Sequence, residues 1–386
     1  MTEKLYYQDS HLAEFQAAVL SCAPAGEGRW AVTLDRTAFF PEGGGQSADT
    51  GFIGGTAVTD VREKDGEIVH YAAGPLTKGE TCPCRIDWPQ RFSRMQNHSG
   101  EHIVSGLVHK LYGYDNVGFH MGEACVTIDF SGELSVDGLE RVEKLANEAV
   151  TRDLPVSAAF PAPEELERLD YRSKKELSGD VRIVTIPGVD VCACCAPHVA
   201  RTGEIGAVKL LSAVRHRGGM RIDMVCGGMA YEVFRREHDS VAAVSAALSA
   251  RQAEVAPAVE RILSENETLK AKNGELARAL VAARLAALPK QCDNLCLFDD
   301  VLPEPALRDW VNGAAERCAG LAAAFSGGGS GGWRYIIGSG HVDLMAAAAE
   351  INAGIGGRGG GSSRMIQGSA TKSKEEIQKF LSSLYI

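Results

Sequence analysis

Two short segments that lie far apart in the chain carry residue types suited to metal binding. The first is His98-Ser-Gly-Glu-His102 and the second is Cys194-Cys-Ala-Pro-His198. On a helix, residues four apart share one face, so His98 and His102 would present two imidazoles to one ion. Thiolate sulfur and imidazole nitrogen are typical zinc ligands. The sequence therefore predicts one split tetrahedral Zn²⁺ site formed by His98, His102, Cys194 and His198.

The neighbouring cysteines leave the identity of the thiolate open, because Cys192 and Cys195 flank Cys194 and either could replace it. The pattern is not the metalloprotease signature, since Glu101 precedes the second histidine and does not follow the first. We therefore give Glu101 no catalytic role and expect it either to support the ligands or to be solvated.

A glycine-rich segment, Pro41-Glu-Gly-Gly-Gly-Gln46, follows an aromatic pair. Consecutive glycines let a backbone approach a ligand closely or adopt positive φ angles. An ordinary turn is the simpler interpretation, and the glycines alone do not decide between the two.

Composition argues against general nucleic-acid binding, because the formal net charge is −10. Any phosphate-bearing partner must then be held by a local basic patch. The candidate is the stretch 201–236, which is poor in acids and contains Lys209, Arg215, Arg217, Arg221 and Arg235. A solvated face of a sheet explains the same pattern.

The strand and helix patterns of the segments around these residues predict an α+β fold. Residues 1–88 alternate like β-strands separated by Gly and Asp turns, which indicates a barrel-like domain. A helix should begin at Trp88-Pro89, carry both histidines and end at Gly113. Residues 89–235 mix strands and helices without βαβ alternation and form the zinc-binding domain in this interpretation.

The spacing of apolar residues changes after residue 235. In residues 236–289, Val241, Leu248, Val255, Ile262, Leu269 and Leu276 recur every seven residues, which favours a coiled-coil seam. Pro257 should break it into two helices or kink one rod. The segment is then a spacer, a dimerisation arm or an ordinary packed helix.

The sequence pattern of residues 290–386 predicts a small glycine-rich domain. A flexible loop is expected over 325–333, then a strand at 335–338 and a helix over 342–353. Gly356-Gly-Arg-Gly-Gly-Gly361 has the amides and the arginine to cradle a phosphate, but it lacks the Lys-Ser/Thr ending of a P-loop.

The 386 residues should form more than one domain. The 11 cysteines are odd in number and irregularly spaced, which argues against a disulfide framework. No apolar run is long enough to cross a bilayer, and the N-terminal residues lack a secretory apolar core. We expect a cytoplasmic protein without a membrane partner.

An ordered series of motifs resembles a known family. It runs from Thr37-Ala-Phe-Phe-Pro-Glu-Gly-Gly-Gly-Gln46 through Asn97-His98-Ser-Gly-Glu-His102 and Cys194-Cys-Ala-Pro-His198 to Thr202-Gly-Glu-Ile-Gly206. Together these motifs resemble the editing domain of alanyl-tRNA synthetase and the free-standing AlaX proteins. Residues 236–386 resemble the C-terminal extension of the long AlaX form. The family often has Cys-Gly-Gly-Thr-His at the second ligand pair, where this chain has Cys-Cys-Ala-Pro-His.

The resemblance implies a deacylase that acts in trans on mischarged tRNA(Ala), with the seryl ester as the first candidate substrate and the glycyl ester as the second. It implies Zn²⁺ held by the four residues named above. Expected catalytic residues are Gln46, Gly44 and Gly45, and expected substrate-binding residues are Thr37, Gly43, Arg215 and Arg217. Thr37 would hydrogen-bond the serine hydroxyl; the alternative is that Thr37 simply fills a position in a β-strand.

Two other functions compete with the deacylase interpretation, and a homodimer is expected with it. A non-catalytic tRNA-binding protein, in which zinc only holds the fold, would show the same motifs. A phosphoesterase is disfavoured because the chain contains no Asp-His-His motif. A homodimer would form through the C-terminal region.

Overall fold

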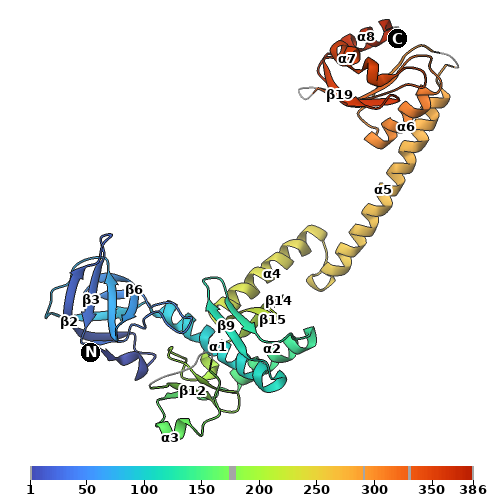
Figure 1. The fold of residues 1–386 in the computed structure, drawn as a ribbon. Coiled ribbons are helices and arrows are strands. Elements are labelled where there is room, and N and C mark those ends of the chain that lie inside the picture. Colours follow the sequence, from blue (N-terminus) through green and yellow to red (C-terminus); the bar gives the residue numbers. More distant parts are fainter. Residues whose placement is uncertain (1, 174–179, 290–291, 329–331, 385–386) are drawn as a thin grey trace. The chain divides into compact units, whose positions relative to one another are not determined.

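The computed structural model describes residues 2–173, 180–289, 292–328 and 332–384, and it separates into two compact units, Met1–Ala242 and Ala243–Ile386 (Figure 1). Several sheets and long helices alternate irregularly along the chain, so the predicted mixed α+β class is confirmed. Within the described residues, none of the helices combines the length and the apolar character that a membrane crossing requires.

The first unit begins with a closed antiparallel barrel, drawn in blue in Figure 1. In spatial order its strands are β2 (Glu14–Pro24), β3 (Trp30–Leu34), β7 (Glu67–Ala72), β6 (Thr56–Lys64), β5 (Gly51–Ile53) and β8 (Thr81–Ile86). Every second residue of β7 and β8 is buried, as expected when one strand face lines a barrel interior. Before the barrel, β1 (Glu3–Lys4) pairs with β4 (Arg36–Thr37), and η1 (Leu5–Tyr7) follows β1.

Helix α1 (Trp88–Tyr112) carries both histidines and follows directly after the barrel. The Asp87 side chain accepts a hydrogen bond from the Gln90 amide and caps the first turn, and Gly113 ends the helix with a φ of 70°. Both ends therefore match the predicted helix.

A buried ion pair joins α1 to the barrel. Arg91 and Asp49 are each fully buried, and the Arg91 Nε atom lies 2.9 Å from a carboxylate oxygen of Asp49. Arg91 also donates to the carbonyl oxygens of Ser10 and Ala38, at 3.1 and 2.5 Å. These bonds satisfy a charge that would otherwise be costly to bury, and they join the first turn of α1 to Ser10, Ala38 and Asp49.

Two sheets surround α1 in the rest of this unit. The larger has the order β14 (Val208–His216), β15 (Gly219–Cys226), β10 (Val126–Phe130) and β9 (Asn116–Met121). The smaller has the order β11 (Ser157–Ala159), β12 (Ile183–Ile186) and β13 (Asp190–Ala193). Helix α2 (Val136–Thr151) packs with α1 on the larger sheet around one apolar core that includes Val104, Ile128, Val142 and Ile222. The short α3 (Pro163–Leu166) and η2 (Thr202–Ile205) complete the unit.

The segment with the seven-residue repeat forms two helices, α4 (Gly228–Leu248) and α5 (Val255–Ala286), with the short η3 (Gln252–Glu254) between them. Pro257 lies in the first turn of α5, where a missing backbone N–H is tolerated. Ile262, Leu269 and Leu276 are exposed on α5. The coiled coil and the homodimer remain predictions.

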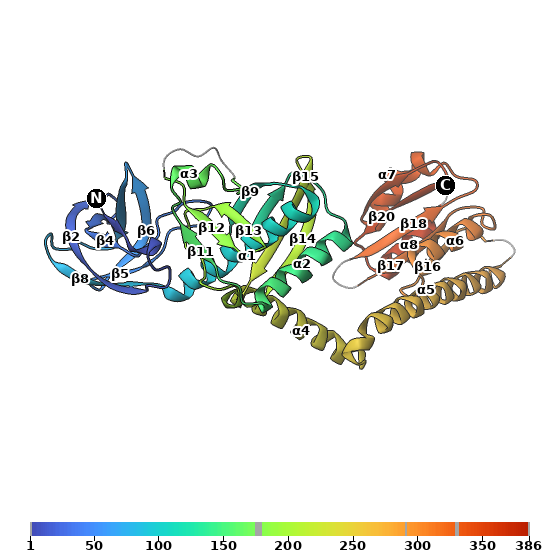
Figure 2. The ribbon, with the colours of Figure 1, turned by 90° about the horizontal axis from the view of Figure 1, so that it is seen from below.

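The second unit contains one five-stranded sheet with helices on both faces (Figure 2). Its order is β16 (Leu295–Phe298), β17 (Ala322–Gly327), β18 (Trp333–Gly338), β20 (Met365–Ala370) and β19 (Gly357–Gly361). Residues that alternate along β17 and β18 face α7 (Leu344–Ile355) and α8 (Lys374–Ser383) on one side, and α5 and α6 (Glu304–Ala315) on the other.

The glycine-rich segment of this unit forms a strand and not a phosphate-cradling loop. Gly356 ends α7 with a φ of 63°, and residues 357–361 form the edge strand β19, paired antiparallel with β20. A side chain at Gly359 would clash with the Gln367 carbonyl oxygen, so the glycines serve close strand pairing here. The loop predicted over 325–333 lies partly outside the described residues, and β17 and β18 extend into its two ends.

Candidate metal centre and its cavity

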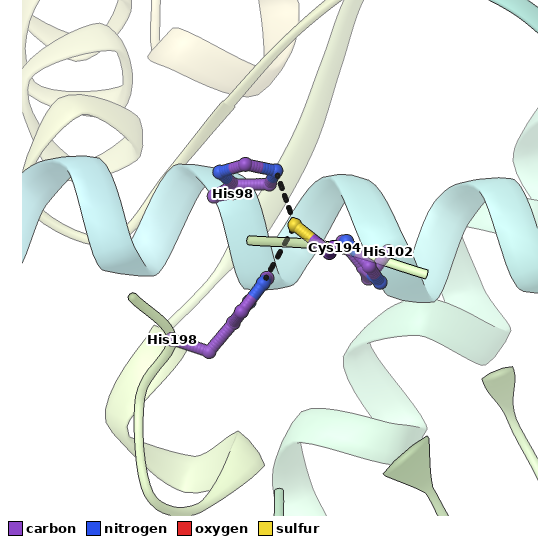
Figure 3. A group of neighbouring side chains, drawn as sticks. All are labelled: His98, His102, Cys194 and His198. Atoms are coloured by element: carbon purple, nitrogen blue, oxygen red, sulfur yellow. Dashed lines mark hydrogen bonds between the residues drawn. The ribbon is translucent and has the colours of Figure 1, made fainter. Parts of the chain in front are cut away.

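The four predicted ligands come together in space. His98 and His102 project from one face of α1, and Cys194 and His198 lie in the segment that follows β13 (Figure 3). The Cys194 Sγ atom lies 3.6 Å from Nε2 of His98 and 3.4 Å from Nε2 of His198. All four ligand atoms lie within 4.8 Å of one another. This group can hold a metal ion.

The second nitrogen of each imidazole is held by an oxygen atom from elsewhere in the fold. Nδ1 pairs with Gln46 Oε1 at 3.0 Å in His98, with Asp190 Oδ2 at 2.9 Å in His102 and with Ser99 Oγ at 3.0 Å in His198. An oxygen acceptor at Nδ1 favours the tautomer whose Nε2 lone pair is free for a metal. The Nε2 atom of His102 is buried without a hydrogen-bond partner among the described residues, as expected for a ligand atom. The site therefore fits a metal ion.

Electrostatics around the group favour a cation. Burial opposes ionisation of the Cys194 thiol, but the surrounding imidazoles of His98 and His198 hold its pKa well below the ordinary value. Burial likewise opposes protonation of His102, yet Asp190 and Cys194 outweigh burial and raise its pKa well above the usual range. Partners that stabilise a proton on His102 would stabilise a metal cation there for the same reason.

Asp190 links the metal centre to an arginine. Its two carboxylate oxygens accept hydrogen bonds from Arg172 Nε and Nη2 at 2.8 and 2.9 Å, and it is almost fully buried. Cys192, Asp190 and His102 form a second group with metal-ligand geometry. Arg172 already neutralises Asp190, and burial raises the pKa of Cys192, so this second group suits a metal ion less well.

The three neighbouring cysteines, Cys192, Cys194 and Cys195, lie in different surroundings in the structure. Cys194 belongs to the four-residue group, whereas Cys195 is exposed and faces the glycine-rich turn. Its Sγ atom lies 3.4 Å from the position that a Cβ atom on Gly44 would occupy. The alternative thiolates, Cys192 and Cys195, therefore do not replace Cys194 in this group.

The glycine-rich turn lies beside the metal centre. The amides and carbonyls of Gly43 and Gln46 bond to each other at 3.0 Å and close the turn. Gly44 and Gly45 have φ angles of 61° and 85°, and a Cβ atom on Gly45 would lie 2.4 Å from the ring of Phe119. Only glycine fits Gly45 without a shift of its neighbours.

A cavity of about 460 Å³ opens over these groups. His98, His102 and Cys194 line it together with Gly44 and Gly45. Aromatic side chains contribute further lining, namely Tyr7, Phe119 and Phe160. Its volume is typical of a small-molecule binding site.

Other residues predicted for substrate binding lie outside this lining. The Thr37 hydroxyl is buried in the barrel, where it pairs with His70 Nε2 at 2.8 Å and accepts a bond from the Phe39 amide. Gly43 adjoins the cavity through the turn without lining it. The substrate roles of Thr37 and Gly43 stay predictions.

The basic stretch is largely paired with acids. Arg215 bonds to Glu133 at 2.8 Å, and similar pairs join Lys209 to Glu143 and Arg221 to Asp129. Arg217 has a φ of 47° in the turn between β14 and β15. A tRNA-binding role for Arg215 and Arg217 therefore remains a prediction.

Reasoning from the sequence missed the residues that support the ligands, above all Asp190, Arg172 and Ser99. The bonded residues lie 18 positions apart for Arg172 and Asp190, 88 for His102 and Asp190, and 99 for Ser99 and His198, so no motif spacing signals them. Glu101 is not solvated. It is fully buried, and its carboxylate accepts bonds from Ser105 Oγ and Asn116 Nδ2, both at 2.6 Å.

Comparison with known proteins agrees with this site. Residues 181–223 match the family model described as the threonyl and alanyl tRNA synthetase second additional domain. This match contains Cys194 and His198. The alanyl-tRNA editing protein AlaX-L of Pyrococcus horikoshii is 34% identical over 71% of this chain and 68% of its own length.

Two further relatives extend the likeness. The alanyl-tRNA editing protein Aarsd1 of Rattus norvegicus is 28% identical over 72% of this chain and 71% of its own length. The alanine–tRNA ligase of Ignicoccus hospitalis is 29% identical over 99% of this chain, which spans only 43% of the ligase. The chain thus belongs to the AlaX-L-like family of alanyl-tRNA editing proteins, which is related to the editing region of alanyl-tRNA synthetase.

Proposed function

We propose that this chain is a trans-acting deacylase that hydrolyses the ester between a wrong amino acid, foremost serine, and tRNA(Ala). The observation that carries the proposal is a metal-binding group and a glycine-rich turn lining one cavity of about 460 Å³. One thiolate and three imidazoles favour Zn²⁺ as the ion. Bound there, Zn²⁺ would supply positive charge that orients the polar groups of the ester beside the turn.

The turn has amide groups available for the reacting ester. In the described part of the chain, the amides of Gly44 and Gly45 donate no hydrogen bond, whereas those of Gly43 and Gln46 are used inside the turn. Preorganised amides that face a developing negative charge on the ester oxygen stabilise the transition state of acyl transfer. We therefore assign this stabilisation to Gly44 and Gly45, and we assign to Gln46 the positioning of His98.

Selection against correct Ala-tRNA(Ala) needs a group that recognises the serine hydroxyl. A site that hydrogen-bonds a hydroxyl can discriminate by roughly 10⁴-fold, whereas an apolar pocket discriminates much less. Our candidate for the group that recognises the serine hydroxyl is Thr37. Thr37→Val should then slow hydrolysis of Ser-tRNA(Ala) more than that of Gly-tRNA(Ala), and equal losses on the two substrates would remove Thr37 from this role.

The deciding experiment measures release of serine, glycine and alanine from tRNA(Ala) by the wild type and by His98→Ala. We expect the wild type to cleave the seryl ester at least tenfold faster than the alanyl ester, and His98→Ala to lose this activity. Bound metal is measured in both proteins.

One observation favours a second function, because four protein ligands can fill a tetrahedral shell, as in structural zinc sites. A tRNA-binding protein without hydrolytic activity would then be the result. Wild-type protein that binds tRNA(Ala) tightly but leaves all three esters intact would establish this alternative.

A further inference from the structure

Two aromatic rings from distant parts of the chain meet in the lining of the cavity. Tyr7 comes from η1 and Phe160 from the residue after β11, and their ring centroids lie 5.4 Å apart in an edge-to-face arrangement. Phe160 is half exposed although it is apolar. Its exposed ring surface is available to a ligand in the cavity.

A buried arginine lies next to these rings. The Arg182 guanidinium lies 5.1 Å from the Tyr7 ring centroid, and its Nη1 atom donates to the carbonyl oxygens of Cys194 and Ala196 at 3.1 and 2.8 Å. These bonds fix the guanidinium beside the segment that carries the metal ligands. Arg182 itself lines the cavity.

Arg182 forms no ion pair with a carboxylate in the part of the chain that the structure describes. The comparably buried Arg91 and Arg172 each have a carboxylate partner, Asp49 and Asp190. Arg182 has none among the described residues, and the cavity-lining Asp180 forms no ion pair with it. Because burying an unpaired charge is costly, such a group suits an anionic ligand.

We propose that Tyr7, Phe160 and Arg182 bind the terminal nucleotide of an RNA 3′ end, with the base stacked on Phe160 and the phosphate facing Arg182. Aromatic side chains stack on every base, and arginine pairs with phosphate. The cavity is far larger than a seryl group, so it has room for part of the nucleotide beside the ester. This inference rests on the proposed deacylase function and adds the site that holds the RNA end.

The probe is an RNA hairpin with the acceptor stem of tRNA(Ala) and the fluorescent base 2-aminopurine at its 3′ end. Stacking quenches this fluorophore. We expect quenching with the wild type and with Phe160→Tyr, which keeps the ring, but not with Phe160→Ala.

Phe52→Ala is the matched control. Phe52 is also an exposed ring beside an arginine, with Arg85 at 5.4 Å, but it lies on the barrel away from the cavity. Phe52→Ala should quench like the wild type. A second readout uses Ser-tRNA(Ala), for which Phe160→Ala should raise KM about tenfold with kcat nearly unchanged, as expected for a lost stacking contact.

Arg182 is tested by salt dependence. Arg182→Met should weaken binding of the hairpin and reduce the slope of log affinity against log salt by about 1. Bound metal is measured as well, because Arg182 also supports the carbonyl of Cys194.

The outcomes separate this inference from the proposed function. Quenching by Phe160→Ala equal to that of the wild type, or no quenching by the wild type, overturns the nucleotide site even if the ester is cleaved. Quenching that depends on Phe160 in a protein that cleaves no ester supports the site and overturns the deacylase.

Discussion

The carboxamide oxygen of Gln46 lies 3.0 Å from Nδ1 of His98, although the two residues are 52 positions apart. Gln46 ends the glycine-rich turn and His98 lies in α1, so one hydrogen bond connects the turn to the metal centre. The Gln46 Nε2 atom is buried and has no hydrogen-bond partner among the described residues. Gln46 thereby orients a metal ligand through one atom while its amino group stays available.

Gln46→Leu should weaken metal binding, because it removes the acceptor that orients His98. Loss of such a partner typically lowers metal affinity by about 10- to 100-fold. Gln46→Glu keeps an oxygen acceptor and should bind metal at least as tightly as the wild type. Competition with a chromophoric chelator measures the affinities, and equal affinities for Gln46→Leu and the wild type would show that this bond does not support the site.

Cys194→Ser should remove most of the bound metal, whereas Cys195→Ser should leave about one ion per chain. Only Cys194 belongs to the four-residue group, and its neighbour Cys195 is exposed beside the glycine-rich turn. Metal content of the purified proteins, measured by mass spectrometry, checks this. Zinc is the ion expected, since thiolate and imidazole are its preferred ligands. A wild type free of metal after gentle purification would contradict the prediction.

His70 should make the folded state sensitive to acid. Its ring is buried in the barrel between the Thr37 hydroxyl and the Val32 carbonyl, and burial lowers its pKa to about 4. The unfolded chain binds a proton at a pKa of about 6.5. Between these values the unfolded state binds more protons, so the free energy of unfolding is highest above pH 6.5 and falls as the pH drops towards 4.

The expected loss from His70 is about 3 kcal/mol between pH 7 and pH 4. Urea denaturation at both pH values measures it. His70→Gln should show a smaller loss, because it removes the buried imidazole. An identical pH dependence for His70→Gln and the wild type would exclude this assignment.

The exposed apolar residues of α5 should mediate a homodimer. Leu269 and Leu276 are 65% and 69% exposed, and they continue the seven-residue repeat. The double substitution Leu269→Glu and Leu276→Glu should convert a dimer to a monomer without unfolding the chain. Val136→Glu on α2 changes a residue that is 70% exposed outside this repeat and serves as the control.

Light scattering gives the molar mass of each variant. A wild type that is monomeric at high concentration, or a dimer that survives both glutamates, would rule out the proposed role of α5.

Local patterns determined much of what could be read from the sequence. The spacing of His98 and His102 and the stop at Gly113 predict α1, because both depend on residues within a few turns of each other. The alternation in residues 1–88 indicates β-structure for the same reason. The ligand set was predicted because few residue types bind zinc and the family resemblance singles out their positions.

Local patterns do not decide between two structures when the same segment suits both. Gly356-Gly-Arg-Gly-Gly-Gly361 suits a phosphate loop and an edge strand equally well, and pairing with β20 decides for the strand. Thr37 matches a substrate-binding position, but the fold brings His70 to its hydroxyl from 33 residues away. In both cases the partner lies outside the motif.

The sequence by itself determined which side chains can hold a metal and which segments are helical or extended. Only the tertiary structure decided that Gln46, Asp190 and Ser99 hold the three imidazoles and that Arg182 lies against Tyr7 at the cavity. The physical reason is that contacts between distant residues are set by the packing of whole elements, such as the buried Arg91–Asp49 pair that fixes α1 against the barrel. No spacing within a motif encodes that packing.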